Sequence, residues 1–185
     1  MKQYYDFKIE KIKDLSPKEV KLRKKYLELF YQIGFPNKND EDWKFSDLNS
    51  ILSNNFNNIA NNNFLSKDKN FKIIDKFEHN YISLFDGKLV SKDFLYEEKD
   101  KILIDNFNYK DELTSDNTNP LYILNNALST GGFSLEISKN YKLKKPLIIY
   151  NNFSNSLKET IINYKNSIIL NENSELSLVN YINNS

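Results

Sequence analysis

From Gly132 onward the chain is a series of short apolar segments separated by polar turns, and this pattern constrains the fold more than any other feature. Phe133, Leu135 and Ile137 alternate with polar residues, which is typical of a strand with one buried face. Four further apolar segments follow, at 146–150, 160–164, 167–170 and 175–181. Short strands joined by turns predict either a β-sandwich or a solenoid of stacked β-coils, and periodicity alone does not choose between them.

A strong helix start lies near the N-terminus. Ser16 can accept a hydrogen bond from the amide of Glu19, the Glu19 side chain can return to the amide of Ser16, and Pro17 fits the first helical position. A broad apolar stripe follows, and Gly34 supplies the C-terminal cap. These signals predict a helix over 17–33.

The next segment is acidic and then aromatic. Asp40 can cap a short helix whose first turn carries Glu41 and Asp42, where the helix dipole favours acids. Trp43 and Leu48 are expected on its buried side. As adjacent residues, the two acids point to different sides, so a role at the helix start is favoured over an acid/base pair. For Trp43 a core position is favoured over a partner-binding anchor.

The middle of the chain contains loops and one clear hairpin. The Asn-rich stretch 54–63 is expected to be a loop. The segment 81–90 is predicted to be a hairpin because Asp86-Gly87 supports the left-handed conformations that a two-residue turn needs. A short strand is expected at 101–104, and 105–119 is interpreted as a connector.

Asn119-Pro120 is expected to begin a second helix, which Gly131-Gly132 ends. The sequence therefore divides into three parts. They are an N-terminal helical region at 1–78, a hairpin and connector at 79–119, and a helix followed by short strands at 120–185.

Composition excludes most catalytic apparatus. The chain has no cysteine, which excludes thiolate metal sites and cysteine nucleophiles, and its one histidine is His79. A lone histidine is more often structural or solvated than a ligand. The four glycines form no phosphate-binding loop. We therefore assign no catalytic, cofactor-binding or metal-binding residue.

Charge and hydropathy restrict the partners. The net charge of +1 argues against a dedicated nucleic-acid binder, and Lys142, Lys144 and Lys145 are interpreted as a solvated turn, not a basic patch. No apolar run approaches the roughly 18 residues that span a bilayer. The N-terminus lacks the apolar region of a secretory signal, so the expected location is the cytoplasm and no membrane partner is expected.

Three segments carry a resemblance to a known family. Gly34-Phe35-Pro36, followed by Asp40-Glu41-Asp42-Trp43-Lys44-Phe45-Ser46-Asp47-Leu48, resembles a signature near the N-terminus of the SufD branch of the SufB/SufD family. Leu124-Asn125-Asn126-Ala127-Leu128, then 132–137 and Lys145-Pro146-Leu147, are similar to the beginning of that family's β-helix. The Asp86-Gly87 turn matches a family hairpin. The first match is the most specific, because SufB shares the β-helix pattern but lacks the Glu-Asp-Trp segment.

The resemblance implies a non-catalytic scaffold subunit that assembles iron–sulphur clusters together with SufB and the SufC ATPase. It implies an α+β fold with an N-terminal helical region followed by the start of a right-handed β-helix. The C-terminal region that binds SufC in the family has no counterpart here, and His79 matches no functional family position. No cofactor is expected in this chain, since the full complex assembles the cluster. An unpaired β-helix edge at 175–181 would favour self-association.

The second hypothesis is a β-solenoid that binds or processes carbohydrates. It predicts aromatic platforms and clustered carboxylates along one solenoid face. The carboxylates after Gly132 are Glu136, Glu159, Glu172 and Glu175, which do not recur at a fixed spacing. The scaffold hypothesis is therefore preferred.

Overall fold

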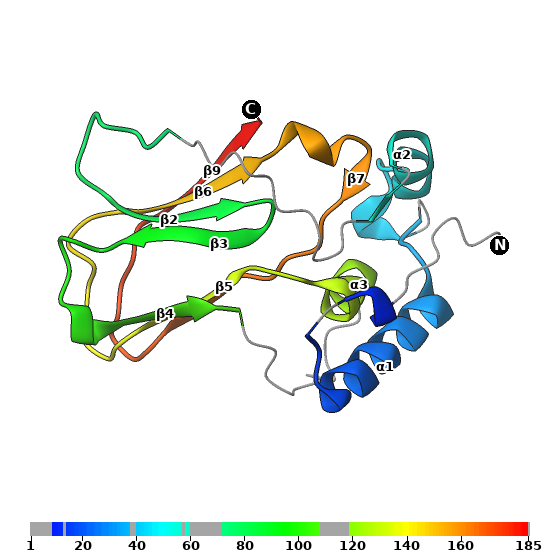
Figure 1. Ribbon diagram of the computed structural model, residues 1–185, viewed down its shortest axis with the longest axis horizontal. Helices are drawn as coiled ribbons and strands as arrows, with labels where there is room; N and C mark the ends of the chain where they lie inside the picture. The colour runs from blue at the N-terminus through cyan, green and yellow to red at the C-terminus, as the bar shows by residue number, and fades with distance from the viewer. Residues whose placement is uncertain are drawn as a thin grey trace. The chain divides into compact units, whose positions relative to one another are not determined.

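The computed structural model describes residues 9–12, 14–37, 40–56, 58–59, 72–107 and 119–184. These residues form helices and mixed β-sheets, which confirms the α+β class (Figure 1). Contacts divide the chain into two compact units, each assembled from several stretches. The first unit takes 1–63, 109–130 and 157–163, and the second takes 64–108, 131–156 and 164–185.

Helix α1 of the first unit spans Pro17–Ile33, as the sequence predicts. Both halves of the capping box form: the Glu19 amide donates to Ser16 Oγ at 3.2 Å, and the Ser16 amide donates to Glu19 Oε2 at 2.9 Å. Gly34, with φ of 77°, ends the helix, and its amide donates to the Phe30 carbonyl at 2.6 Å. The prediction was right because local contacts alone define both ends.

Helix α3 of the same unit spans Pro120–Leu128. Its start is the predicted one, since Asn119 Oδ1 accepts from the amides of Leu121 and Tyr122 at 2.9 and 3.3 Å. Its end differs, because the helix stops at Leu128 and Gly131-Gly132 lies beyond it. Those glycines lie where two other segments of the same chain pass very close to them, as described below.

Helices α1 and α3 pack together and form the core of the first unit. A single 3-10 turn, η1 (Ile9–Lys11), adds Ile9 to this core. Arg23 lies buried within it and donates from Nη1 to the Ala127 carbonyl at 3.0 Å, which satisfies a carbonyl near the end of α3. The buried apolar residues are Ile9, Tyr26, Leu27, Phe30, Ile123, Leu124, Ala127 and Leu128.

The segment after α1 differs from the prediction. Asp40 does not cap a helix with its side chain: Oδ2 accepts from the Asn37 amide at 2.8 Å, and only one 3-10 turn follows, η2 (Glu41–Trp43). Trp43 is half-buried and does not lie in the core. The longer helix that was expected to give Trp43 a buried side does not form, and no residue of η2 is buried.

The Asn-rich stretch begins in a helix that the sequence did not predict. Helix α2 spans Leu48–Asn55, and Asp47 caps it by accepting from the Ser50 amide at 3.0 Å. Strand β1 (Asn58–Ile59) then pairs in parallel with β7 (Thr160–Ile161). The loop prediction for 54–63 was therefore wrong at its start, and residues 57 and 60–63 lie outside the described residues.

Two β-sheets face each other in the second unit. The first has the order β3-β2-β6-β9 and the second the order β4-β5-β8. Their strands are β2 (Asn80–Phe85), β3 (Lys88–Asp93), β4 (Ile102–Asn106), β5 (Phe133–Ile137), β6 (Leu147–Phe153), β8 (Ser167–Leu170) and β9 (Leu178–Asn184). The core between them contains Ile82, Leu84, Ile104, Phe133, Leu135, Ile137, Tyr141, Leu147 and Ile149.

The predicted hairpin is confirmed. Strands β2 and β3 pair antiparallel around Asp86 and Gly87, whose φ angles are 49° and 76°. The strand expected at 101–104 is β4, which follows the 3-10 turn η3 (Lys99–Lys101). Of the predicted connector at 105–119, residues 108–118 lie outside the described residues.

Each segment predicted as a strand after Gly132 contains one, but β7 covers only Thr160–Ile161 of the predicted 160–164, and β9 begins at Leu178 and not at 175. Apart from β7, these strands pair in a repeating way. Strand β5 pairs in parallel with β8, and β6 pairs in parallel with β9, so the chain visits the two sheets in the same order twice (Figure 1). A single 3-10 turn, η4 (Asn155–Leu157), interrupts the series of strands. Parallel neighbours require long connections, which this alternation between sheets supplies.

Stacked turns connect the two passes. Asn140 and Asn173 both have positive φ, 60° and 57°, and Asn173 Nδ2 donates to Asn140 Oδ1 at 3.0 Å. Lys139 pairs with Glu172 and Lys142 with Glu175, each pair separated by 33 residues like the two asparagines. The same turn therefore occurs twice, with basic residues in the first copy opposite acidic residues in the second.

Glycines permit a close crossing at the end of the hairpin. A Cβ on Gly131 would lie 2.4 Å from the Gly87 carbonyl oxygen. A Cβ on Gly132, whose φ is +113°, would lie 1.8 Å from the Lys165 carbonyl oxygen. Only glycine fits these positions, which explains the adjacent glycines that the sequence analysis assigned to a helix end.

Candidate functional site

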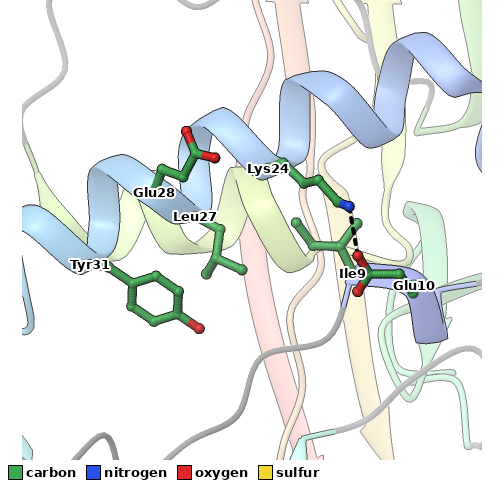
Figure 2. A pocket seen from close by; sticks show the side chains of 6 residues that line it. All are labelled: Ile9, Glu10, Lys24, Leu27, Glu28 and Tyr31. Atoms are coloured by element: carbon green, nitrogen blue, oxygen red, sulfur yellow. Dashed lines mark ion pairs between the residues drawn. The ribbon is translucent and has the colours of Figure 1, made fainter.

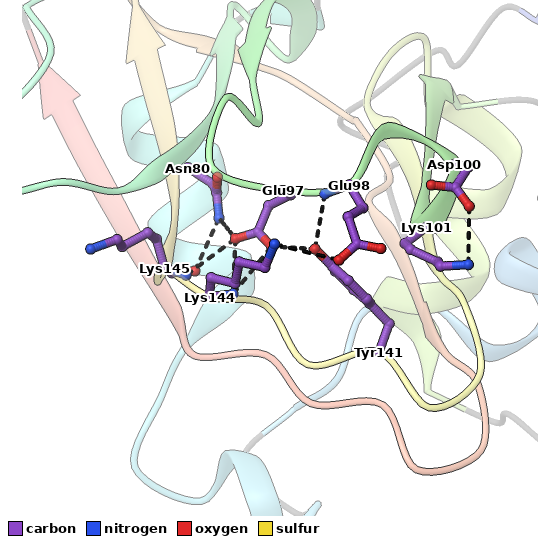
Figure 3. Close-up of polar contacts among 8 residues, drawn as sticks. All are labelled: Asn80, Glu97, Glu98, Asp100, Lys101, Tyr141, Lys144 and Lys145. Carbon is purple, nitrogen blue, oxygen red and sulfur yellow. Dashed lines mark hydrogen bonds and ion pairs between the residues drawn. The ribbon is translucent and has the colours of Figure 1, made fainter.

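The most elaborate polar cluster surrounds Glu97, a buried carboxylate in the turn after β3 (Figure 3). Its Oε1 accepts from Asn80 Nδ2 at 2.7 Å and from the amides of Lys144 and Lys145 at 2.9 and 3.1 Å. Its Oε2 accepts from the Tyr141 hydroxyl at 2.7 Å and from the Lys144 amide at 3.1 Å. Four donor groups therefore share one carboxylate.

Two separate parts of the chain supply these donors. Asn80 is the first residue of β2, and Tyr141, Lys144 and Lys145 lie in the turn between β5 and β6. The Tyr141 hydroxyl also accepts from the Glu98 amide at 2.9 Å, so the tyrosine bonds the Glu97 turn twice. The cluster fastens the turn after β3 to the turn that carries the chain from one sheet to the other.

The electrostatics of Glu97 favour its charged form. Burial raises the pKa of the carboxyl, but the hydrogen bonds from Asn80, Tyr141, Lys144 and Lys145 outweigh burial, and the pKa lies below its ordinary value. Burial raises the pKa of the Tyr141 phenol, and the nearby Glu97 acts in the same direction. At neutral pH the cluster therefore contains a carboxylate and a protonated phenol.

The hydrogen bonds of Glu97 are better suited to holding two turns together than to proton transfer. The Glu97 carboxylate accepts five hydrogen bonds, which occupy its lone pairs, and it lines none of the three pockets described below. A general base needs a reachable lone pair and a pKa near the operating pH. We interpret the cluster as a clasp between two turns.

His79 is buried beside strand β2. Its Nδ1 lies 2.9 Å from the Phe77 carbonyl oxygen, and its Nε2 lies 2.9 Å from the Tyr150 hydroxyl. The Phe77 carbonyl can only accept a hydrogen bond, so we place the proton of the imidazole on Nδ1. Nε2 then accepts from the Tyr150 hydroxyl, which itself accepts from the Ile74 amide at 3.1 Å. Both ring nitrogens are engaged, which matches the structural role favoured from the sequence.

The three lysines of the turn before β6 each pair with a carboxylate. Lys142 pairs with Glu175, Lys144 with Glu98 at 3.4 Å, and Lys145 with Glu78 at 2.5 Å. Figure 3 shows the Lys145 side chain extending away from Glu97. The basic residues are therefore dispersed over several ion pairs and form no patch that could bind a phosphate backbone.

The acidic and aromatic residues of the segment 40–48 do not form a common site. Glu41 and Asp42 are exposed on the 3-10 turn η2, and Trp43 is half-buried. Phe45 is 95% exposed, with Lys44 Nζ 5.8 Å from its ring centre. The large apolar side chain of this segment that faces solvent is thus Phe45, which the sequence analysis did not single out.

A shallow groove runs along α1 in the first unit (Figure 2). Its walls come from η1 and α1: Ile9, Glu10, Lys24, Leu27, Glu28 and Tyr31. Lys24 Nζ and Glu10 Oε1 pair across it at 2.7 Å. Its volume of about 160 Å³ is smaller than the roughly 300–1,000 Å³ of typical ligand sites.

Two larger pockets lie in the second unit. One, of about 460 Å³, is bounded by the segment 73–79 and by residues from β2 and the turn after β3. The other, of about 440 Å³, lies between the outer strands β3 and β4 and contains the exposed side chains of Leu95 and Leu103. Both have the size of a ligand site.

Within the described ranges, no three His, Asp or Glu side chains come together in a way that could hold a metal ion. Among the helices that the structure describes, none combines the length and apolar character needed to cross a membrane.

Two features escaped the sequence analysis for different reasons. The Glu97 clasp joins residues 17 to 48 positions apart, and no spacing rule connects them. The stacked turns do leave a signal, since Lys139-Asn140-Tyr141-Lys142-Leu143 and Glu172-Asn173-Ser174-Glu175-Leu176 share an asparagine, flanking charges of one sign and a leucine.

Comparison with protein-family models found no match for this chain, and comparison with curated proteins found none either.

Proposed function

We propose that this chain is a SufD-like scaffold subunit of the SUF iron–sulphur cluster assembly machinery, which works together with SufB and the SufC ATPase. In this proposal the chain corresponds to the N-terminal helical region and the first coils of a right-handed β-helix. It acts in the cytoplasm, performs no catalysis and holds no cofactor of its own, since the full complex assembles the cluster.

The observation that carries the proposal is the order of the sequence signatures. The segment Asp40–Leu48, the Asp86-Gly87 turn and the Leu124–Leu128 helix followed by strands occur in the order of the SufD branch. A scaffold requires no nucleophile or metal ligand, and the absence of cysteine from the sequence is compatible with such a role.

The strand pairing supports the β-helix part of the proposal. In a β-helix each coil adds one strand to each sheet, so successive coils pair in parallel at similar spacings. Leu135 pairs in parallel with Ile168, 33 residues later, and Leu147 pairs in parallel with Leu178, 31 residues later. The stacked turns at Asn140 and Asn173 lie 33 residues apart, as the paired residues of β5 and β8 do.

Co-expression tests the proposal. The natural gene product that contains this chain is tagged and co-expressed with SufB and SufC of the same organism, and captured complexes are analysed by size-exclusion chromatography with light scattering. We expect a complex that contains all three proteins. Absence of both SufB and SufC from the captured material would refute the proposal, and saturable binding to an oligosaccharide panel would favour the carbohydrate-binding hypothesis.

A matched pair of variants locates the contact. Phe45→Ala removes an exposed aromatic ring from the signature segment, and aromatic side chains are enriched at binding hot spots. Leu103→Ala removes a 61% exposed apolar side chain from β4 and serves as the control. We expect Phe45→Ala to weaken capture of a partner while Leu103→Ala does not, with unchanged thermal unfolding in both.

A further inference from the structure

The 460 Å³ pocket of the second unit combines aromatic rings with carboxylates. Phe77, Tyr81 and Tyr96 contribute rings, and Asp75, Glu78 and Asp93 contribute acids. Lys76 is the one lysine of its lining, and with His79 counted as neutral the formal charge of the lining is negative. Aromatic faces and carboxylates together attract organic cations, because both present negative potential to the ligand.

The aromatic walls are held in place. The Tyr81 hydroxyl lies 3.4 Å from Ser91 Oγ, and the Tyr81 ring packs edge-on against Tyr150 with centres 6.2 Å apart. Phe77 packs against the imidazole of His79 at 5.1 Å, and His79 is fixed at both nitrogens. Fixed rings lose little freedom on binding, which favours recognition.

The acids come from two sides of the pocket. Asp75 and Glu78 belong to the segment before β2, and Asp93 ends β3. Asp93 Oδ1 accepts from the Leu95 amide at 2.9 Å, which orients its carboxylate. A cation between these sides would meet carboxylates from both.

The chain already places one of its own cations at the edge of this pocket. Lys145 Nζ lies 5.6 Å from the Tyr96 ring centre and 2.5 Å from Glu78 Oε2. The hydrogen bond and charge of Glu78 raise the pKa of the Lys145 ammonium. Two lining residues, Tyr96 and Glu78, thus contact an ammonium group of the chain itself, so this edge of the pocket already accommodates a cation.

We propose that this pocket binds an arginine side chain presented by a segment of a partner protein. A guanidinium stacks on aromatic faces and forms forked hydrogen bonds with carboxylates, so it matches the pocket better than a compact ammonium. Arg23 is the only arginine in the sequence; it is buried in the first unit, where it donates a hydrogen bond to the Ala127 carbonyl. The arginine that binds this pocket therefore comes from another molecule. Phe77 and Leu95, 50% and 78% exposed at the rim, fit apolar neighbours of that arginine in the partner segment.

The test uses the 185-residue chain and a short alanine-glycine peptide that contains one arginine and one leucine. The matched peptide carries citrulline, which has the shape of arginine without its charge. Titration is followed by NMR of the ¹⁵N-labelled protein. We expect saturable binding of the arginine peptide with Kd on the order of 1 mM or below, and at least tenfold weaker binding of the citrulline peptide.

Two protein variants complete the test. Asp93→Asn retains the shape of a pocket carboxylate without its charge, and Asp105→Asn makes the same change on an exposed residue of β4. We expect Asp93→Asn to weaken arginine binding about tenfold and Asp105→Asn to leave it unchanged. Equal binding of the citrulline peptide, equal effects of the two variants, absence of saturable binding, or preference for a neutral oligosaccharide would each overturn the proposal. It does not depend on the SufD-like assignment.

Discussion

Removal of the Glu97 charge should destabilise the second unit strongly and in a pH-dependent way. In Glu97→Gln the side chain keeps its length and one oxygen, but the other oxygen becomes an NH2 group that faces donors. The donors left without an acceptor are Asn80 Nδ2 and the amides of Lys144 and Lys145 if the NH2 takes the Oε1 position, or the Tyr141 hydroxyl and the Lys144 amide if it takes the Oε2 position. Hydrogen bonds to charged groups contribute about 1.5–3 kcal/mol each, and a buried donor without an acceptor costs about 1–3 kcal/mol. We expect a loss of about 2–4 kcal/mol in the free energy of unfolding.

The pH dependence follows from the lowered pKa of Glu97. In the unfolded chain the carboxyl titrates near its ordinary value of 4.5, whereas in the folded protein it titrates lower. Between the two values the unfolded state binds more protons, so the contribution of Glu97 is complete above the unfolded value and disappears as the pH falls through the folded value. The stability difference between wild type and Glu97→Gln should therefore be constant near neutral pH and shrink below about pH 4.5.

Urea denaturation followed by circular dichroism measures this difference, and NMR hydrogen exchange of the Lys144 and Lys145 amides measures it locally. Glu98→Gln is the matched control, because Glu98 is the adjacent residue and its carboxylate forms an exposed ion pair with Lys144 at 3.4 Å. That pair should contribute about 0–1 kcal/mol. Equal losses in the two variants, or a Glu97→Gln loss that persists unchanged at low pH, would refute the clasp interpretation.

Three further predictions concern the crossing, the stacked turns and the outer strand β9. Gly132→Ala should prevent folding of the second unit, because its Cβ would lie 1.8 Å from a backbone oxygen. Gly34→Ala, also at positive φ but with no atom within 4 Å of the added Cβ, should lower the free energy of unfolding by about 1 kcal/mol in thermal unfolding, and equal losses in the two variants would contradict the steric argument. Reversal of one charge in the Lys139–Glu172 pair should destabilise the protein by up to about 1 kcal/mol, and reversal of both charges should restore its stability. The coupling energy from this double-mutant cycle should disappear in 1 M salt, and its absence at low salt would contradict the pairing of the two turns. The outer strand β9 contains no charged residue, so light scattering should show self-association of the 185-residue chain at high concentration. Ile182→Lys, at a 61% exposed position, should reduce the self-association, and a wild-type chain that stays monomeric would contradict the prediction.

Sequence reasoning succeeded where structure is decided by neighbouring residues. The bounds of α1 follow from the Ser16–Glu19 box and Gly34, and the β2–β3 hairpin follows from Asp86-Gly87. It failed where contacts compete with composition. Helix α2 forms in an asparagine-rich stretch because Asp47 caps it and the Asn55 side chain donates to the Ile51 carbonyl at 2.7 Å, contacts that compensate for the low helix propensity of asparagine.

The polar cluster could not be predicted because its members meet only after the sheets have formed. Asn80 and Glu97 lie on either side of the β2–β3 hairpin, and Lys145 lies 48 residues beyond Glu97. No periodicity relates these positions. The pocket residues Phe77, Tyr81 and Asp93 are dispersed in the same way, since the antiparallel pairing of Tyr81 with Asp93 brings them together.

The stacked turns explain how the two passes keep their register. Adjacent parallel strands can slip by two residues without exposing their buried face, so the side-chain pattern alone does not fix the alignment of β5 with β8. The turn favours one alignment, because it brings Asn140 and Asn173, both in left-handed backbone conformations, into a side-chain hydrogen bond and places the two Lys–Glu pairs opposite each other. A pattern of asparagine, flanking charges of one sign and a following leucine, repeated with the opposite sign 33 residues later, therefore marks the alignment of β5 with β8, and it can be sought in other chains whose overall sequences have diverged.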